Sequence, residues 1–411
     1  MFAYNLLIFL YVMAIRAALP FSRKARLWVR GRRRIFRRLR EAFADNERVV
    51  WVHAASLGEF EQGRPLIEAI KAQHPEYKLL LTFFSPSGYE VRKDYKGADH
   101  VFYLPADAPA NVRRFLRTVR PEVAIFVKYE FWLNYLRGLR RIGCRTFLVS
   151  AIFRRDSVFF RWYGGAYRRA LATYETIFAQ HGLSLQLLAE LGVNSAVEAG
   201  DTRFDRVAAI AAAARGNGTV ERFGGDGRLL VAGSTWPPDE ATLMEAAAQF
   251  DDLKLVIVPH ETEPARIDRL MALLDEKGLN AVRYSDERAD LAAARVLVVD
   301  TIGLLSSLYR YGWLTYIGGG FGAGIHNTLE AAVFGRPVAF GPNYRRFMEA
   351  REMVDLGCAR SVATAQELEA WIGGYIAEPL RYGADCRAAA DYVASNRGAA
   401  DLIINSIFGG K

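Results

Sequence analysis

Two successive series of short apolar runs and amphipathic segments constrain the fold of this chain more than any other feature. In the first series, runs of four to six mostly apolar residues are bounded by Gly, Pro and Asp. Such runs are typical of parallel strands buried on both faces. The predicted strands are Val49–Ala54, Leu79–Phe84, Val101–Leu104, Val123–Val127, Thr146–Ser150 and Thr176–Ala179.

A second series follows an Ala-rich helix and the Gly-rich stretch Gly216–Gly227. Amphipathic helical segments such as Ala241–Phe250 and Ile267–Leu274 lie between its strands. Two βα series predict two doubly wound, Rossmann-like domains, at residues 46–205 and 206–411, with a ligand at the carboxyl ends of the strands. The last helix could pack back on the first domain. The predicted strands are Leu229–Ala232, Leu255–Val258, Val296–Val299, Leu314–Ile317 and Val338–Phe340.

The net charge of +9 belongs to the first 40 residues, which hold eleven Lys or Arg and no Asp or Glu. The remainder carries 43 basic and 45 acidic residues and is nearly neutral. An apolar run at residues 1–19, interrupted by Arg16, is marginal for a membrane span, which needs about 20 apolar residues. Because the charges follow this run, residues 1–45 read as a membrane anchor and basic segment rather than a signal peptide. A basic helix that binds RNA or a partner is the alternative.

The three cysteines lie far apart and form no C-x-x-C pair, which argues against a zinc site or a disulfide framework and indicates a reducing compartment.

The stretch WVHAASLGEFEQGRPLIEAI contains Ser56 and Glu59 at the spacing of a helix capping box, directly after a predicted strand. An α/β enzyme could place a catalytic base at the same position. Gly58 would lie in the first helical turn and Pro65 in the third, and both disfavour a helix. The sequence therefore predicts a poor cap, with a helix that begins late, near Pro65, or begins at Gly58 and is kinked. It favours the catalytic interpretation of Glu59.

A Gly-rich loop after the strand at 314–317 predicts close backbone approach by a ligand. A helix beginning near His326-Asn327 would favour an anion such as phosphate, and Glu330 could reach a ribose diol. A purely structural cap formed by Asn327 and Glu330 is an equal alternative. The sequence lacks G-x-G-x-x-G and a P-loop at this place, which disfavours a dinucleotide or P-loop fold.

Ser234 and Thr235 follow another strand, and their hydroxyls could donate to a phosphate. A structural turn before the Pro-initiated helix is the more common use of such residues. His260 ends the next strand, and a lone His in that setting is more often structural than catalytic.

In order and spacing, these loops resemble the 3-deoxy-D-manno-octulosonic acid (Kdo) transferases of lipopolysaccharide assembly. The resemblance covers nearly all of the chain. It includes HAASLGE, VKYEFW, GDTRFD, GSTWPPDE, VPHE, DTIG, GIHNTLEAA and FGPNYRRF.

The resemblance implies a GT-B glycosyltransferase, with two Rossmann-like domains facing across a cleft and an N-terminal membrane-associated helix. Residues 46–205 would bind the acceptor and residues 206–411 the CMP-sugar. The enzyme would move Kdo from CMP-Kdo to a tetraacylated lipid A precursor with inversion, on the cytoplasmic face of the inner membrane. Its other partners would be inner-membrane lipids, and no nucleic acid is expected.

The resemblance also assigns roles to residues. Glu59 would be the general base, and the other acceptor-side positions are Ser56, Gly58, Lys128 and Glu130. The nucleotide-binding positions are Ser234, Thr235, His260, Gly319, Gly320, Asn327 and Glu330. No cofactor or metal is expected, since the chain contains no Asp-x-Asp. The chain departs from the family at Leu304, where a Glu is frequent, and at Ile325, where a second Gly is frequent.

Two alternatives remain open at this point. One is another GT-B sugar-nucleotide enzyme, such as a UDP-sugar transferase or an epimerase. The other is a non-enzymatic protein that binds a membrane or RNA through residues 16–40.

Overall fold

The computed structural model describes residues 1–43 and 47–409. The predicted boundary between residues 45 and 46, and the last two residues of the predicted second domain, lie outside the described residues. The chain divides into two compact units. The first unit is Met1–Arg206 together with the chain from Arg397 onward, and the second is Val207–Asn396.

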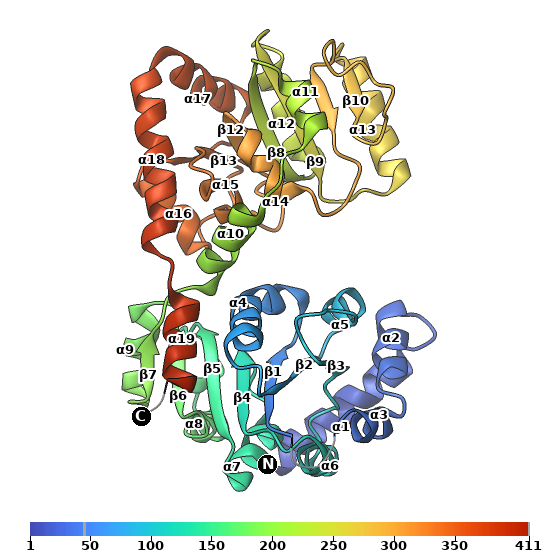
Figure 1. Cartoon of the computed structure of the whole chain (residues 1–411), viewed down its shortest axis with the longest axis vertical. Coiled ribbons are helices and arrows are strands. Elements are labelled where there is room, and N and C mark those ends of the chain that lie inside the picture. The colour runs from blue at the N-terminus through green and yellow to red at the C-terminus, as the bar shows by residue number, and fades with distance from the viewer. Residues whose placement is uncertain (44–46, 410–411) are drawn as a thin grey trace. The chain divides into compact units, whose positions relative to one another are not determined.

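The first unit is built on a seven-stranded parallel sheet with the order β3-β2-β1-β4-β5-β6-β7 (Figure 1). The six strands predicted from the apolar runs are confirmed, with bounds that differ by at most one residue at each end. The seventh, β7, has only three residues, two of them exposed, and is not predicted from the sequence. The strands are β1 Val49–Ala54, β2 Lys78–Phe83, β3 His100–Tyr103, β4 Val123–Val127, β5 Arg145–Ala151, β6 Thr176–Ala179 and β7 Ala196–Glu198.

Helices cover both faces of this sheet. On one face α4 packs against β1, β4 and β5, and the C-terminal helix α19 packs against α4. On the other face α3, α6, α7 and α8 form a continuous layer. These helices are α3 Ile35–Ala42, α4 Leu57–Gln73, α6 Pro109–Val119, α7 Leu133–Ile142, α8 Gly165–Leu171 and α19 Ala399–Phe408. The others of the unit are α5 Pro86–Arg92, the 3₁₀ turn η1 Val158–Phe160, α9 Gly182–Glu190 and α10 Thr202–Ala213, which leads into the second unit.

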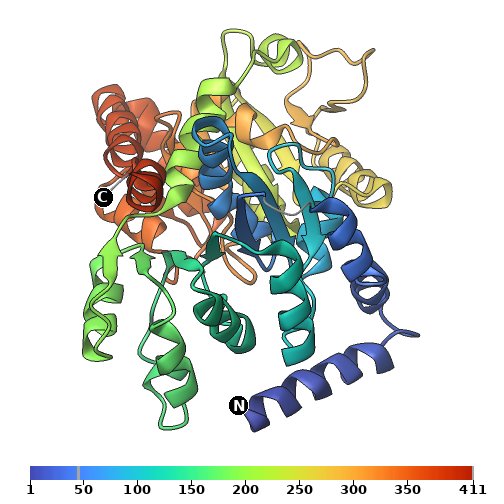
Figure 2. The same ribbon diagram turned by 60° about the horizontal axis from the view of Figure 1, so that its bottom comes forward.

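The N-terminal helices differ in how they are held. Helix α1 (Phe2–Ala17) buries none of its own residues and lies at the edge of the unit (Figure 2). Helices α2 (Arg23–Gly31) and α3 bury Trp28, Ile35 and Leu39. Within the part of the chain that is described, no helix combines the length and apolar character that crossing a membrane would take.

Arg32 fixes the α2–α3 segment to the sheet. Its guanidinium lies 3.8 Å from the Trp28 ring centroid and also faces the rings of Phe84 and Tyr103. It donates to the backbone oxygens of Leu104 and Phe84, both at 2.8 Å. Burial lowers the pKa of Arg32 to about 9.

The second unit contains another seven-stranded parallel sheet, with the order β10-β11-β9-β8-β12-β13-β14. The five predicted strands are confirmed as the inner part of the sheet, whereas the outer strands β10 and β14 are not predicted. The strands are β8 Arg228–Thr235, β9 Leu253–Pro259, β10 Ala281–Arg283, β11 Val296–Val298, β12 Leu314–Ile317, β13 Val338–Phe340 and β14 Ala359–Ser361.

Helices again flank this sheet, with α12 packed against β9 and α17, and α15 packed against α18. A core of aliphatic and aromatic side chains fills the space between helices and strands. The helical segments are α11 Gly218–Gly224, α12 Pro237–Ala247, α13 Pro264–Glu276, α14 Leu305–Leu308, η2 Tyr309–Tyr311, α15 Leu329–Ala332, α16 Met348–Asp355, α17 Ala365–Ala377 and α18 Pro379–Ser395.

Each sheet has one point at which the strand order reverses. In the first unit the chain moves outward from β1 to β2 and β3, then returns to place β4 on the other side of β1. In the second unit β8 and β12 flank the corresponding point. Loops at the carboxyl ends of such strand pairs diverge, so ligands of open α/β sheets bind there. The candidate residues after β1, β4, β8 and β12 all lie at these two positions.

Candidate functional site

Glu59 lies in the first turn of α4 and closes a capping box with Ser56. Its Oε2 accepts hydrogen bonds from the Ser56 backbone N at 2.9 Å and from Ser56 Oγ at 3.1 Å. The helix begins at Leu57 and runs past Pro65 to Gln73. The predicted poor cap is therefore wrong, and so is the late helix start near Pro65.

Tertiary contacts explain why α4 tolerates its Gly and Pro residues. A Cβ on Gly63 would lie 2.9 Å from Val127 Cγ2, so a glycine lets the helix approach β4 closely. Pro65 removes the helical N–H that would donate to the Glu61 oxygen, and Thr202 Oγ1 donates to the backbone oxygen of the next residue, Gln62, at 2.6 Å. Packing on the sheet thus offsets local propensity, which is a weak determinant on its own.

The cap leaves one oxygen of Glu59 available. Oε1 makes no hydrogen bond to any residue that the structure describes, whereas Oε2 accepts both bonds from Ser56. Burial raises the pKa of Glu59, and the nearby charge of Glu130 raises it further, against the opposing effects of Ser56 and His53. Gly58 beside it is exposed, and a Cβ there would meet nothing within 4 Å. A raised pKa and a free oxygen are the properties of a general base.

Glu130 follows β4 and is almost fully buried within a chain of hydrogen bonds. Trp51 Nε1 donates to Thr82 Oγ1 at 2.8 Å, and His53 Nδ1 lies 2.8 Å from the same Oγ1 and 3.1 Å from the Thr82 backbone oxygen. His53 Nε2 lies 2.9 Å from Glu130 Oε2.

Trp132 Nε1 donates to the same Glu130 oxygen. His53 is not predicted as a site residue from the sequence, because it lies within the apolar run of a buried strand. Its only sequence signal is a polar residue within an otherwise apolar run.

Three strands end in strained backbone, two of them at candidate site residues. Lys128 after β4 has φ 70°, Ser150 near the end of β5 has φ 53°, and Ser234 near the end of β8 has φ 54°. This left-handed conformation is costly for residues other than glycine and is concentrated at functional sites. Lys128 Nζ lies 5.5 Å from the Tyr129 ring centroid.

In the second unit the Gly-rich loop after β12 packs directly against neighbouring backbone. A Cβ on Gly318 would lie 2.3 Å from the Ser234 oxygen, and one on Gly320 would lie 2.5 Å from Gly341 N. Gly319 has φ 92°. The glycines therefore allow the strand ends to approach each other closely. The sequence predicts only that they admit a ligand.

Asp239 organises this loop and is a residue that the sequence analysis missed. It is fully buried. Its Oδ2 accepts from the backbone N of Gly319 and of Trp236, both at 2.9 Å. Its Oδ1 accepts from Tyr316 Oη at 2.9 Å. Burial raises the pKa of Asp239, and these three hydrogen bonds favour the ionised form.

Ser234 and Thr235 differ in availability. The Thr235 hydroxyl is buried and donates to Glu240 Oε1 at 2.9 Å, and Glu240 in turn pairs with Arg266. The Ser234 hydroxyl makes no hydrogen bond to any described residue. Of the two predicted phosphate donors, Ser234 is therefore the one with a free hydroxyl.

The helix expected near His326-Asn327 is a single turn, α15, whose first helical residue is Leu329. The predicted helix start near His326-Asn327 is therefore wrong, and a helix of four residues has little macrodipole with which to favour an anion. Asn327 Nδ2 donates to Glu330 Oε1 at 3.2 Å, and Asn327 Oδ1 accepts from Leu329 N at 3.3 Å. Thr328 is the N-cap residue of α15 and makes no side-chain cap hydrogen bond, so the predicted alternative of a cap at Asn327 is not formed, although Asn327 and Glu330 do bond to each other.

His260 belongs to a row of stacked rings. Its ring centroid lies 4.9 Å from that of Trp236 and 4.5 Å from that of His326, with interplanar angles of 27° and 24°. Burial and the charge of His260 lower the pKa of His326. The three rings form a half-exposed flat surface beside the Gly-rich loop.

Within residues 1–43 and 47–409, no group of three or more His, Cys, Asp or Glu side chains is placed to hold a metal ion.

Comparison with known proteins identifies relatives over most of the chain. A family model described as 3-deoxy-D-manno-octulosonic-acid transferase (kdotransferase) matches residues 30–206. A 3-deoxy-D-manno-octulosonic acid transferase from Bordetella pertussis is 30% identical over 377 residues, which are 87% of this chain and 86% of that protein. A protein of the same name from Aquifex aeolicus is 26% identical over 77% of this chain and 82% of its own length.

The fold is similar to that of solved sugar-nucleotide enzymes. The crystal structure of UDP-GlcNAc 2-epimerase from Neisseria meningitidis, bound to UDP-GlcNAc, aligns with a TM-score of 0.63 at 14% identity. The alignment covers 88% of this chain and 100% of the epimerase chain. At this identity the likeness concerns the two Rossmann-like domains alone.

Proposed function

Because this chain belongs to the 3-deoxy-D-manno-octulosonic acid transferase family and is a glycosyltransferase, we propose that it transfers Kdo from CMP-Kdo to a lipid A precursor with four acyl chains. We further propose that the reaction inverts the anomeric centre, that Glu59 is the general base, and that catalysis takes place at the cytoplasmic face of the inner membrane. No cofactor or metal takes part in this proposal.

The environment of Glu59 is the observation that supports its role as the general base. Its Oε2 is held by Ser56, its Oε1 has no partner among the described residues, and its pKa is raised. A fixed carboxylate with one free oxygen can accept the proton of an acceptor hydroxyl without first breaking a hydrogen bond. General base catalysis by such a group contributes typically ~10²–10⁴-fold.

In the proposed reaction the acceptor hydroxyl oxygen forms a bond to the anomeric carbon of Kdo as the bond from that carbon to the CMP phosphate oxygen breaks. The hydroxyl proton passes to Glu59 Oε1, and the electron pair leaves with CMP. Attack opposite the leaving group inverts the anomeric centre. Lys128 and Glu130 lie on the neighbouring strand end, where Lys128 offers a cation to an anionic acceptor.

The second unit supplies groups suited to a sugar nucleotide. Ser234 offers a free hydroxyl to the phosphate, and the glycines at 318–320 keep side chains away from the loop. Asn327 and Glu330 offer polar groups to the ribose. The rings of Trp236, His260 and His326 provide a flat surface on which a base can stack.

The test is to incubate the full-length protein with CMP-Kdo and a tetraacylated lipid A precursor in detergent and to read the product by mass. We expect the mass of one or more added Kdo residues. The matched ligand test measures thermal unfolding with CMP, UMP and UDP, where CMP should raise the unfolding temperature most. Protection by UDP and not by CMP would favour the alternative of a UDP-sugar enzyme.

A further inference from the structure

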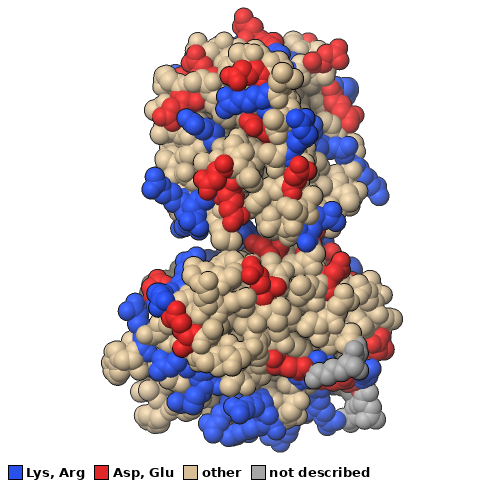
Figure 3. All heavy atoms as spheres, turned by 90° about the vertical axis from the view of Figure 1, so that its left-hand side faces the viewer, with Lys and Arg blue, Asp and Glu red and all other residues tan. Residues whose placement is uncertain are grey.

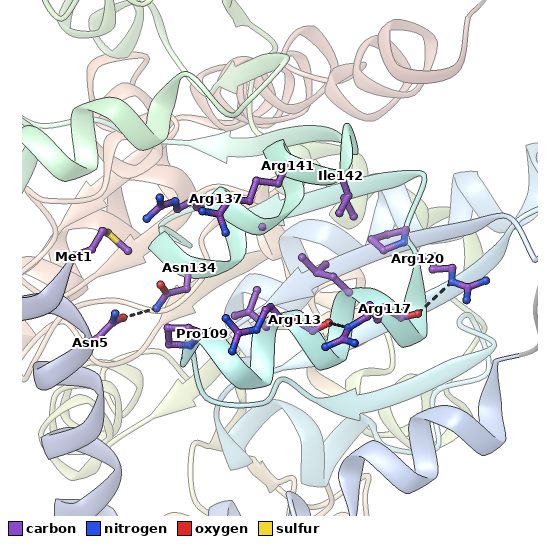
Figure 4. A pocket seen from close by; sticks show the side chains of 14 residues that line it. Met1, Asn5, Pro109, Arg113, Arg117, Arg120, Asn134, Arg137, Arg141 and Ile142 are labelled. Atoms are coloured by element: carbon purple, nitrogen blue, oxygen red, sulfur yellow. Dashed lines mark hydrogen bonds between the residues drawn. The ribbon is translucent and has the colours of Figure 1, made fainter.

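Helices α6 and α7 border a groove of about 580 Å³ on the layer of the first unit opposite α4. Figure 4 shows side chains of the two helices converging on it, with Met1 and Asn5 of α1 at one end. The volume falls within the range of ordinary ligand sites, about 300–1,000 Å³. No residue that the sequence analysis assigned to catalysis or nucleotide binding lines this groove.

The floor of the groove is apolar. Val112 and Leu116 of α6 face Gly138 of α7, and a Cβ at Gly138 would lie 2.6 Å from Leu116 Cδ1 and 2.9 Å from Val112 Cγ1. The glycine therefore keeps the space between the helices open. Ile142 at the end of α7 is 51% exposed, although it is aliphatic. A floor of this kind suits a hydrocarbon chain.

The rim of the groove is cationic. Arg113 and Arg117 project from α6, and Arg137 and Arg141 project from α7 (Figure 4). All four are exposed, and none of them forms an ion pair with another described residue. Figure 3 shows Lys and Arg gathered at the lower end of this unit, with few Asp or Glu between them. An anion is thus the missing partner of the rim.

One end of the groove is lined by Met1 and by Asn5 of α1, a helix with exposed apolar side chains. Asn134 of α7 donates from Nδ2 to Asn5 Oδ1 at 2.8 Å, and Tyr4 Oη donates to Asp107 Oδ2 at 2.6 Å, which ties α1 to the start of α7. On α1 the side chains of Phe2 and Phe9 are 84% and 59% exposed. A helix with so much exposed apolar surface is expected to lie against other apolar material.

We propose that the groove between α6 and α7 holds one anionic phospholipid of the bilayer surface on which α1 lies. An acyl chain occupies the apolar floor, and the phosphate contacts the arginine rim. The proposal rests on the membrane association given under the proposed function, and it does not depend on the donor or on Glu59. An acidic peptide or RNA would satisfy the rim but would leave the floor unfilled.

The experiment uses the full-length protein in a mild detergent and titrates in dioleoyl-phosphatidylglycerol or dioleoyl-phosphatidylcholine. Native mass spectrometry counts the lipids that each chain retains. We expect one phosphatidylglycerol per chain at saturation and much weaker retention of phosphatidylcholine. Excess inorganic phosphate should displace little of the bound lipid, because phosphate cannot occupy the apolar floor.

Two variants test the rim and the floor. Arg113→Gln combined with Arg137→Gln removes one cation from each wall and should weaken phosphatidylglycerol binding by about tenfold or more. Ile142→Glu places a charge at the floor and should weaken it similarly, and because Ile142 is half exposed the fold should persist. The matched control, Arg30→Gln with Arg33→Gln, removes two cations from the separate arginine cluster of α2 and α3 and should leave binding unchanged.

Equal retention of both lipids, unchanged binding in the groove variants, or displacement by inorganic phosphate would each overturn the proposal. Kdo transfer to a detergent-solubilised acceptor is measured on the same samples. If phosphatidylglycerol binds as expected while no transfer occurs, the proposed function fails and the lipid site stands. If transfer occurs and the protein does not retain phosphatidylglycerol, the lipid site fails and the proposed function stands.

Discussion

At the scale of single residues, Glu59 combines two roles that the sequence presents as alternatives. Oε2 completes a capping box with Ser56, and Oε1 points to no described partner. A capped carboxylate cannot rotate away from its position without losing two hydrogen bonds, so the cap fixes the orientation of the second oxygen. Preorganisation of this kind is what a proton acceptor requires.

Glu59→Gln separates the two roles. The amide oxygen still accepts from the Ser56 backbone N, so the free energy of unfolding should change by less than about 1 kcal/mol. The amide cannot take up a proton, so transfer should fall by ~10²–10⁴-fold while CMP binding persists. Transfer assays, CMP titration and denaturant unfolding measure the three quantities. A variant that transfers at a normal rate would contradict the catalytic role.

Glu130→Gln tests the electrostatic link to Glu59. The charge of Glu130 raises the pKa of Glu59. Glu59 must be ionised to act as a base, so activity falls as pH drops through its pKa. Removal of the Glu130 charge should lower that pKa and shift the acidic limb of the kcat/KM profile to lower pH. Gln retains an oxygen that can accept from His53 and Trp132.

The control for this shift is Glu76→Gln, which removes an exposed carboxylate that does not act on Glu59. The acidic limb should stay in place in this variant. An unmoved limb in Glu130→Gln, with the protein folded, would show that the two carboxylates are not coupled.

At the scale of elements, the sequence predicts the inner strands and the edge strand β3 well and misses the other three edge strands. Strands such as β1 and β4 are buried along their whole length, so their apolar runs mark both ends. The outer strands β7, β10 and β14 have three residues each and are only partly buried. They pair because a neighbouring strand offers free backbone groups, and side-chain patterns do not record that.

The candidate site is likewise predictable in part: the positions of its residues are, and their hydrogen-bond partners are not. Its positions are predictable because they lie at strand ends, where the apolar run stops and polar residues begin. The hydrogen-bond partners are not predictable, since His53, Thr82 and Asp239 meet their partners only through tertiary packing. The course of α4 past Pro65 is not predictable for the same reason, because it depends on packing against residues distant in sequence, such as Val127 beside Gly63 and Thr202, which donates to the Gln62 oxygen.

Gly320→Ala tests the close approach of the ends of β12 and β13. A Cβ would lie 2.5 Å from the backbone N of Gly341, and backbone cannot move aside as a flexible side chain does. We expect unfolding free energy to fall by about 1–3 kcal/mol and CMP binding to weaken. Gly322→Ala is the matched control, because its Cβ would meet only the Gly319 oxygen at 3.7 Å. Equal stability of the two variants would contradict this explanation.

At the scale of the whole molecule, the N-terminal 43 residues contain two parts with different relations to the first unit. Helix α1 buries no residue and is held by the hydrogen bonds of Tyr4 and Asn5. Helices α2 and α3 contribute Ile35, Leu39 and Phe43 to the main core. The basic residues of this region therefore do more than supply surface charge, since Arg32 binds the backbone oxygens of Leu104 and Phe84 and holds the segment on the sheet.

Two truncations distinguish these parts. Deletion of residues 1–20 removes α1, whose apolar side chains are exposed, and keeps Ser22, which caps α2. The protein should fold with a modest loss of stability, because only a few hydrogen bonds of about 1–3 kcal/mol each are lost. It should no longer float with phosphatidylcholine vesicles, since the exposed apolar helix is gone.

Deletion of residues 1–43 removes Ile35, Leu39 and Phe43 from the core as well. Loss of each large buried side chain costs about 2–5 kcal/mol, and three such losses are comparable with the whole stability of an ordinary domain, about 5–15 kcal/mol. In the protein that lacks residues 1–43, the first unit should therefore fail to fold. The protein that lacks only residues 1–20 should still bind CMP, and its first unit should unfold in one cooperative step. Thermal unfolding followed by near-ultraviolet circular dichroism measures both truncations. If the deletion of residues 1–43 were as stable as that of 1–20, α2 and α3 would be accessory, and the division drawn here between anchor and core would be wrong.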